Sequence, residues 1–389
     1  MFPQELCDVV IDHLCAYPAA LTACSVVSHA WRATSLRWLF ETVTVIDKPD
    51  DQNRFDSFTS FLTNSPHIAG RVVNLHFRSG PYTITTLTLT QLILILSKLA
   101  HLRSLSLAAL TLCGDPPTPL PAVPALESLT LTRVMQVIPR NKDRVLFFML
   151  NLFPFLQELS LHEYHDNFLP LPGQPSLPKV TLQKLDLVNP SVQLLSFLQN
   201  CIVACTSLVI RCPVPLSGLG RMIGIVSSSV ESICFIEVGH RGSKASSWSS
   251  YPSQLIFVVQ DYSPLNLHTC TSLQTATIRI GPSYARPWAA TSHILLNLPH
   301  TCRRIGIAML RAEMDLTAIG GGVHQLGPIF DRFTNLERVV IGFADVWEPT
   351  SKASVEKLSR YEKVIRLALS GLDERGILEW QLDYDGLVV

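Results

Sequence analysis

The residues that come nearest to a catalytic motif are His162, Glu163, Tyr164 and His165. Their order is one residue shorter than the H-E-x-x-H motif, which places two imidazoles on one face of a helix to hold zinc. The shorter spacing cannot bring the two rings to one helical face, and the segment before it is typical of a strand. We therefore expect these four residues to lie on the surface at a strand end.

Cysteines are the second possible source of metal ligands, since the chain has 10. Structural zinc sites use paired cysteines at C-x-x-C spacing, often with histidines. Cys201 and Cys205 are instead four residues apart on a segment that we expect to be helical, where both would pack inward. None of the candidates has a matching second pair, so we expect no metal. They are Cys201, Cys205 and Cys212, and the pairs His268/Cys270 and His300/Cys302.

Glycine clusters provide no nucleotide-binding motif. Gly218, Gly220 and Gly224 have a last gap one residue longer than the dinucleotide fingerprint, and the required acidic residue does not follow. The run Gly320–Gly322 lacks the Lys-Ser/Thr of a phosphate loop, so we expect a flexible turn there. No G-x-S-x-G elbow is present. The sequence therefore predicts a protein without a cofactor and without a catalytic site.

The charge balance argues against two further classes of function. The chain carries 31 basic and 31 acidic residues, which gives a formal net charge of zero. We therefore expect neither nucleic acid nor a membrane surface as a partner. Its apolar runs are far shorter than the roughly 18–20 residues that span a bilayer. Cysteines inside apolar runs, with no secretory signal and no N-glycosylation sequon, favour the cytoplasm or the nucleus.

A repeated pattern of leucines supplies the framework. The spacing L-x-x-L-x-L occurs four times with leucine at every position, and successive copies begin 24, 30 and 26 residues apart. Relaxed copies, with a weaker one at Pro252/Leu255/Phe257, extend the series from Val72 to Leu336 in ten steps with a mean of about 26 residues, within the range of leucine-rich repeats. The strict copies are Leu102/Leu105/Leu107, Leu126/Leu129/Leu131, Leu156/Leu159/Leu161 and Leu182/Leu185/Leu187.

Each repeat predicts a short strand whose two alternate apolar side chains point inward. Stacked repeats give a parallel sheet on a concave face, with helices on the convex face. The helices are expected at 87–99, 142–153, 192–204, 216–227, 292–298 and 324–333. Prolines interrupt the connections at 116–124 and 170–178. The relaxed strand cores lie at Val72/Leu75/Phe77, Cys205/Leu208/Ile210, Val230/Ile233/Phe235, Leu273/Ala276/Ile278, Cys302/Ile305/Ile307 and Leu336/Val339/Ile341.

The repeats depart from the leucine-rich consensus at one position. The asparagine expected after the third leucine is replaced by Leu110, Val134, Tyr164 and Pro190. Because that asparagine normally satisfies backbone groups at the inner turn, we expect an irregular solenoid. A generic α/β domain with alternating helices and strands is the other possible fold class.

The end of the chain changes character. A Gly/Ser-rich segment at 239–252 is typical of an exposed loop. A charged helix is expected over 354–369, with Glu356 and Arg360 one turn apart and a break at Gly371. A last strand at 377–382 would follow. We expect residues from about 350 to 389 to cap the solenoid.

The first 41 residues have a different pattern. Apolar residues at helical spacing predict a first helix from Pro3, a second over 19–27 after Pro18, and a third from Ser28 to Phe40. A strand over 41–46 follows. Three short helices bury too little apolar surface to be stable alone. The expected domains are therefore residues 1–41 and a solenoid over 42–389.

This N-terminal segment resembles the F-box of fungal, basidiomycete-type F-box proteins. The strings F-P-Q-E-L-C-D-V-V-I-D-H-L, A-C-S-V-V-S-H-A-W and L-R-W-L-F-E-T-V-T-V carry the resemblance. Phe2 stands where the family usually has leucine. The resemblance covers the whole chain in layout but only the first forty-odd residues in motif. The matching residues are Pro3, Glu5, Leu6, Ile11, Leu14, Val27, Ser28, Trp31, Leu39 and Phe40.

The resemblance implies a function without chemistry. In the family the F-box binds a Skp-family adaptor, and through it a cullin, while the following repeats capture a protein for ubiquitin transfer. Another hypothesis is that the three helices only cap the first repeat of an interaction scaffold. The resemblance implies adaptor contacts by Pro3, Glu5, Leu6, Val10, Leu14, Leu21, Val27 and Trp31.

A captured protein would meet the strand residues that flank the buried leucines, because side chains alternate along a strand. Early repeats present mainly Ser, Thr and Ala at these positions, whereas later ones are more basic. We therefore expect the later repeats to engage a protein surface bearing acidic groups. The candidates are His76, Arg78, Glu158, His162, Lys184, Asp186, Arg211, Arg279, Arg304 and Arg338.

Overall fold

The computed structural model describes residues 3–47, 54–80, 85–114, 122–136, 145–164, 178–212, 216–237, 263–280, 287–310, 316–344 and 352–381. The chain forms two compact units, Met1–Val180 and Thr181–Val389. Within the described residues, 12 strands belong to one sheet and three more form a small second sheet. Together with the helices between them, these strands give an α/β architecture, in agreement with the predicted class.

The first unit contributes five parallel strands in the order β1-β2-β4-β6-β8. They pair in one register, so that Leu75, Leu105, Leu129 and Leu159 form a continuous buried row. A second buried row contains Phe77, Leu107, Leu131 and Leu161. The strands are β1 Thr42–Asp47, β2 Asn74–Ser79, β4 Ser104–Ala108, β6 Ser128–Thr132 and β8 Glu158–His162.

The second unit continues the same repeat with the strands β9 to β15. From β10 onward every described pair is parallel, and a buried row runs through Leu208, Ile233, Ala276, Ile305 and Val339. The strands are β9 Val180–Val188, β10 Ile202–Cys212, β11 Ser232–Glu237, β12 Thr275–Ile280, β13 Arg304–Leu310, β14 Arg338–Ala344 and β15 Leu378–Gln381.

The predicted strand cores are confirmed. Every apolar residue of the four strict and six relaxed copies is buried, with at most 5 % of its surface exposed. This follows from the strand itself, because alternate side chains point to one face and the stacked rows exclude water from it. The pattern therefore identified the strand and the inward face of each of these ten copies, but not β3, β5 and β7 of the small second sheet.

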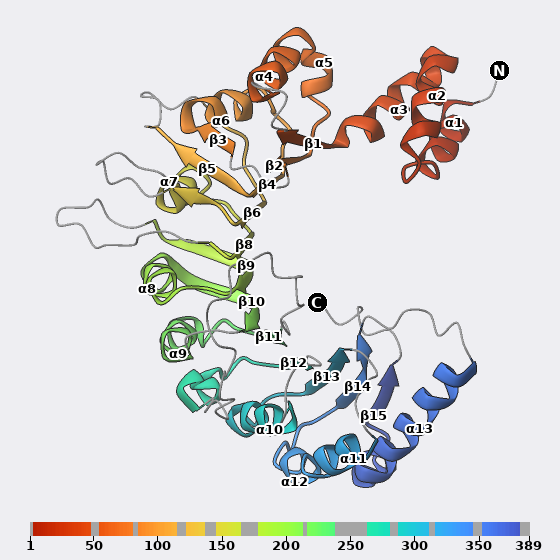
Figure 1. Ribbon diagram of the computed structural model, residues 1–389, viewed down its shortest axis with the longest axis vertical. Coiled ribbons are helices and arrows are strands. Elements are labelled where there is room, and N and C mark those ends of the chain that lie inside the picture. The colour runs from red at the N-terminus through yellow and green to blue at the C-terminus, as the bar shows by residue number, and fades with distance from the viewer. Residues whose placement is uncertain are drawn as a thin grey trace, which may run out of the picture. The chain divides into compact units, whose positions relative to one another are not determined.

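Helices cover the face on which the buried rows lie. Figure 1 shows α6 and α7 beside β4, β6 and β8 in the first unit, and α8, α9 and α10 beside β9 to β13 in the second. The helices are α4 Arg54–Asn64, α5 Pro66–Ala69, α6 Leu89–Leu96, α7 Val145–Leu152, α8 Val192–Cys201, α9 Leu216–Val226, α10 Pro287–Asn297, α11 Leu316–His324 and α12 Gly327–Phe330; two short 3-10 turns are Ser263–Leu265 and Leu267–Thr269.

A left-handed residue follows the strand in each strict repeat. Ala109, Arg133, Glu163 and Asn189 all lie two residues after the third leucine and have φ between 49° and 55°. The backbone N–H of Ala109 donates to the carbonyl of Thr132, and that of Arg133 to the carbonyl of His162, both at 2.8 Å. The N–H of Asn189 likewise donates to the carbonyl of Arg211 at 3.3 Å, so a main-chain hydrogen bond ties these three turns to the end of the next strand.

The missing asparagines have an apolar replacement. Leu110, Val134, Tyr164 and Pro190, which follow the left-handed residues, are all buried. In the first unit the chain then forms a second parallel sheet of β3 (Thr85–Thr88), β5 (Leu110–Cys113) and β7 (Met135–Gln136). Backbone bonding and apolar packing thus hold the inner turns where the consensus uses a side-chain amide.

Two expectations about glycine and cysteine were wrong. Gly320–Gly322 lies inside α11 and is not a turn. A Cβ on Gly322 would lie 2.0 Å from Cδ1 of Trp288, so glycine permits the close approach of α10 and α11. Cys205 is buried as expected but lies on β10, because α8 ends at Cys201 and the strand begins at Ile202.

The C-terminal elements follow the prediction closely. A helix, α13, spans Lys352–Ala368, and β15 adds to β14 in parallel. The ring of Phe343 lies 5.4 Å from that of Tyr361 and 5.6 Å from that of Trp380, so α13 and β15 share one aromatic cluster. The predicted break falls at Leu369 instead of Gly371, which lies inside α14 (Ser370–Glu374).

Several expectations fall outside the described residues. They concern most of the two proline-rich connections, the Gly/Ser-rich segment, the weaker repeat copy at Pro252/Leu255/Phe257, His165 and the last eight residues of the cap. The helix expected over 324–333 is observed in part, as α12, after α11 has ended at His324. The domain boundary expected at residue 41 stays a prediction.

Candidate functional site

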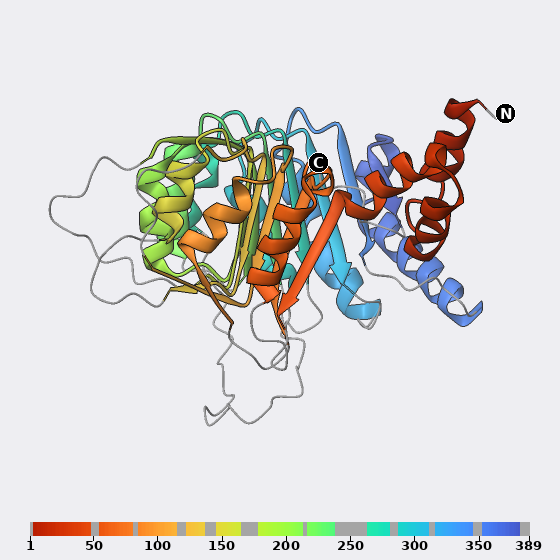
Figure 2. The same cartoon turned by 90° about the horizontal axis from the view of Figure 1, so that it is seen from above.

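Three helices precede the first strand: α1 Gln4–Asp12, α2 Pro18–Val27 and α3 His29–Glu41. Both α1 and α2 pack on α3. Figure 2 shows the three helices together, with α3 leading into β1, which begins at Thr42 directly after it. The buried side chains at their centre are few, and they are Cys7, Ile11, Leu21, Cys24 and Ser35.

Polar contacts hold α1 against α3. The hydroxyl of Thr34 donates to Asp8 at 2.5 Å, and the indole N–H of Trp38 donates to Asp12 at 2.6 Å. The bond from Thr34, with a second from Gln4, keeps the pKa of Asp8 below its usual value. At the start of α3, the side chain of Ser28 accepts the N–H of Trp31 as an N-cap. These bonds fix α1 in place while leaving one side of it uncovered.

The uncovered side is apolar. Leu6, Val9 and Val10 on α1 are 52 %, 52 % and 48 % exposed, and Val26 and Val27 at the end of α2 are 82 % and 65 % exposed. Leu6, Val9 and Val10 share one face of α1 by helical spacing, and we call these three, with Val26 and Val27 at the end of α2, the helical apolar surface. Large apolar side chains exposed in a cluster mark an interaction site, whereas isolated ones need no explanation.

Most of the residues implied by the F-box resemblance are accessible. Pro3 and Glu5 are exposed at the start of α1, with Pro3 as its N-cap, while Leu14 and Trp31 are half-buried. Leu6, Val10 and Val27 belong to the helical apolar surface. Leu21 is different, because it is 1 % exposed and packs inside the three helices. Its assignment as a surface contact is therefore corrected to a core position.

Sequence reasoning missed two members of this surface. Val9 lies three residues after Leu6, so helical spacing alone could have placed it on the same face. Val26 adjoins Val27 at the end of α2, where an apolar residue is expected to face the core. No signal in the sequence distinguishes that valine from a buried one.

The second candidate region is the face of the strands opposite the buried rows. In the first unit, register aligns Arg78 with Ala108, Thr132 and His162. Arg78 and Glu158 are exposed and His162 is half-buried. A neighbouring row contains His76, Ser106, Thr130 and Ser160. Small polar side chains thus dominate here, as the sequence predicted.

In the second unit the same face carries a cluster of ionisable groups around Cys234. Arg211 and Arg279 align in one row of β10 to β12, with Ile236 between them. Burial raises the pKa of Cys234 to about 11, against the opposing effect of the guanidinium groups of Arg279 and Arg211. Lys184 and Asp186 belong to the same cluster. The structure therefore brings together four of the ionisable residues that the sequence placed on this face.

Two of the expected cations are already paired. Arg211 forms an ion pair with Asp186 at an N–O distance of 3.1 Å, and Asp186 is only 7 % exposed. Arg338 forms an ion pair with Glu379 on β15. Arg304 is exposed and aligns with Arg338 along the sheet. The face is consequently less basic than the arginines alone suggested.

The described residues contain no group of three His, Cys, Asp or Glu side chains placed to bind a metal. Four thiols, of which Cys234 is half-buried and the others are buried, are poor nucleophiles, because burial raises their pKa: to about 12 for Cys205 and Cys302, and to about 11 for Cys234 and Cys270. In the part of the chain that is described, no helix combines the length and the apolar character that crossing a bilayer requires.

Comparison with known proteins adds no further identification. No protein-family model matches the chain, and no curated protein matches it.

Proposed function

We propose that the protein is a non-catalytic substrate receptor of an SCF-type ubiquitin ligase. In this proposal α1 to α3 form an F-box that binds a Skp-family adaptor and through it a cullin. The strands and helices after Thr42 form an irregular leucine-rich-repeat solenoid that binds a protein substrate. The proposal places the protein in the cytoplasm, the nucleus or both.

The observation that carries the proposal is the helical apolar surface. Burying an apolar side chain that is half exposed stabilises an interface by roughly 1 kcal/mol, at about 25 cal/mol per Å². Leu6, Val9, Val10, Val26 and Val27 together supply such an interface core, with Pro3 and Glu5 at its rim. The F-box resemblance names an adaptor as the partner.

The same surface argues against the second function, a scaffold whose helices only cap the solenoid. A cap turns its apolar side chains toward the repeat that it covers. Here Val26 and Leu6 are exposed, while the contacts between the helices and the following segment include a polar bond, from Arg71 to the carbonyl of Ala33 at 2.8 Å. A capping function leaves the exposed valines without a purpose.

For the substrate we propose the face of the strands that carries Arg279 and Arg304. The partner is a protein surface with acidic groups, as expected from the sequence, and Arg338 contributes less because of Glu379. Replacing Arg279, Arg304 and Arg338 together with alanine is expected to weaken substrate capture at least tenfold, on the order of 1.4 kcal/mol. Unchanged capture would exclude this face.

The adaptor proposal is tested by affinity purification of the full chain and mass spectrometry of the proteins that accompany it. The wild type is expected to recover a Skp-family adaptor and a cullin. A Leu6→Asp variant should lose both, because it places a charge in the apolar surface. Ser60→Asp, an exposed position on α4, is the matched control and should recover them. Equal recovery by the wild type and Leu6→Asp would argue for the scaffold.

A further inference from the structure

Among the residues that the structure describes, β1 is the first strand of its sheet and its outer edge has no neighbouring strand. Within the described residues it pairs with β2 alone. The N–H of Gly80 donates to the carbonyl of Asp47 at 2.7 Å, so the odd-numbered residues of β1 bond toward β2. Since backbone groups alternate along a strand, Thr42, Thr44 and Ile46 direct their N–H and C=O groups to the other edge.

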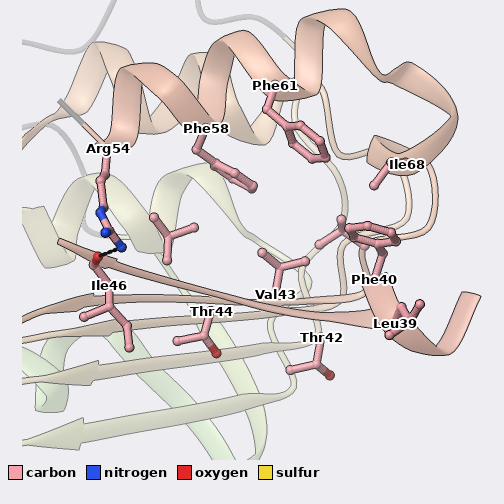
Figure 3. Close-up of a pocket in the computed structure, with 12 residues that line it drawn as sticks. Leu39, Phe40, Thr42, Val43, Thr44, Ile46, Arg54, Phe58, Phe61 and Ile68 are labelled. Atoms are coloured by element: carbon pink, nitrogen blue, oxygen red, sulfur yellow. Dashed lines mark hydrogen bonds between the residues drawn. The ribbon is translucent and has the colours of Figure 1, made fainter. Parts of the chain in front are cut away.

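The position of Arg54 supports this orientation. Its guanidinium, at the start of α4, donates to the carbonyl of Ile46 at 3.0 Å from the open side. Figure 3 shows this bond at one end of the strand, with Thr44 and Thr42 further along. Arg54 therefore occupies one end of the edge and places a positive charge there.

An apolar pocket of about 450 Å³ lies along the same edge. Val43 and Val45 of β1 form one wall, Phe58 and Phe61 of α4 the other, and Phe40 and Ile68 lie toward one end. Figure 3 shows the rings of Phe58 and Phe61 pointing from α4 toward the strand. Phe61 is 39 % exposed and lies 6.4 Å from the ring of Phe40. The pocket thus has aromatic walls and an accessible mouth.

The sequence of β1 favours pairing at this edge. Natural edge strands are usually protected by lysine, proline, a bulge or very short length. The six residues of β1 are Thr-Val-Thr-Val-Ile-Asp, with no lysine or proline. The first five of them are strong strand formers. A strand of this composition beside an apolar pocket is suited to accept another strand.

We propose that β1 binds an extended peptide segment of a protein partner by strand addition. The segment bonds to the backbone of Thr42 and Thr44, and its alternate apolar side chains enter the pocket against Phe58 and Phe61. An acidic group of the segment lies near Arg54. In this mode main-chain hydrogen bonds supply affinity and the pocket supplies specificity. The site uses none of the residues of the helical apolar surface, so it stands independently of the adaptor.

Two other occupants fit the observations less well. A small apolar molecule could fill the pocket but would leave the N–H and C=O groups of Thr44 unused. A second copy of this chain would bring its own β1, whose Val43 and Val45 already line its own pocket. An extended segment with apolar side chains on one face uses both the edge and the pocket.

The test selects phage-displayed random peptides of about eight residues on the full chain, long enough to span the six residues of β1. Enriched peptides should alternate apolar and polar residues and carry an acidic residue near one end. Thr44→Pro removes an N–H from the open edge without breaking the β1–β2 ladder. It should therefore weaken the binding of the enriched peptides about tenfold or more. Thr44→Ala keeps the N–H and should bind within about twofold.

N-methylated versions of one enriched peptide give a second measurement that needs no folded variant. Methylation at one set of alternate amides should abolish binding, and methylation at the other set should not. The proposal is overturned if both sets act equally, if Thr44→Pro binds as Thr44→Ala does, or if no peptide is enriched. A dimer of the wild type that Thr44→Pro dissociates would assign the edge to a second copy and overturn it too.

Discussion

The guanidinium of Arg211 on β10 binds the carboxylate of Asp186 on β9 through two nitrogens, at 3.1 and 3.4 Å. The two partners differ in burial, since the Asp186 side chain is 10 % exposed and that of Arg211 is 36 % exposed. A buried charge costs more to leave unpaired than one that water can reach. Losing the ion pair therefore costs more free energy at the carboxylate of Asp186 than at the guanidinium of Arg211.

This asymmetry predicts an order of stabilities. Arg211→Ala should lower the free energy of unfolding by roughly 2–3 kcal/mol, because it removes the bidentate partner of a carboxylate that is 10 % exposed, and Asp186→Ala by roughly 1–2 kcal/mol. Lys184→Ala, a neighbouring change on β9, should stay within about 0.5 kcal/mol. Urea unfolding of the three variants measures the order, and an Arg211→Ala value equal to that of Lys184→Ala would contradict it.

The glycines of α11 predict opposite effects at neighbouring positions. Gly322→Ala should destabilise the protein by about 1–3 kcal/mol, because the new Cβ would overlap the ring of Trp288. Gly321→Ala should stabilise it by up to about 1 kcal/mol, since nothing lies within 4 Å and alanine is the better helix former. Thermal melts of both variants test the close packing of α10 and α11. Equal shifts of the two melting temperatures would disprove that packing.

The left-handed turn at Ala109 predicts a gain from glycine. A non-glycine residue in this region costs roughly 1–2 kcal/mol. Ala109→Gly, at φ 55°, should therefore raise the free energy of unfolding by about 1 kcal/mol. The control is Ala108→Gly, on β4, which should lower it. If chemical denaturation shows that Ala109→Gly and Ala108→Gly lower the free energy of unfolding equally, Ala109 does not have the left-handed conformation.

The buried thiols predict a loss of stability at alkaline pH. Burial raises the pKa of Cys205 and Cys302 from 9.0 to about 12, so the native state keeps protons that the unfolded state releases. The contribution of each thiol is complete below pH 9 and falls by about 1.4 kcal/mol per pH unit above it. Cys205→Ala should flatten the decline of the unfolding midpoint between pH 9 and 10, and an unchanged slope would refute the assignment.

The repeat pattern predicted the strands because it depends on side-chain alternation, which is local. Leu105, Leu129 and Leu159 align as expected, and each is at most 1 % exposed. The helix limits were less predictable, as the end of α8 at Cys201 shows, because apolar Ile202 and Val203 suit a helix or a strand. Gly320–Gly322 was misjudged because only the distant Trp288 explains a glycine inside that helix.

The positions of the candidate site residues could be predicted from the sequence, but their ion pairing and their exposure could not. The strand registers place Arg211 and Arg338 on the expected face, and Asp186 binds Arg211 there. Nothing in the sequence indicated that Glu379, 41 residues after Arg338, would pair with it. Similarly, helical spacing could not decide that Leu21 faces inward while Val26 and Val27 face water, because all three suit either side of α2.

The substrate-receptor proposal is tested most directly by titrating the purified full chain with a purified Skp-family adaptor in a calorimeter. We expect one-to-one binding with a dissociation constant in the micromolar range or tighter, on the order of −8 kcal/mol. Val9→Asp should weaken it about a hundredfold, and Ser60→Asp should leave it within about twofold. Absence of binding by the wild type, or equal binding by Val9→Asp and the wild type, would contradict the proposed role of α1 to α3.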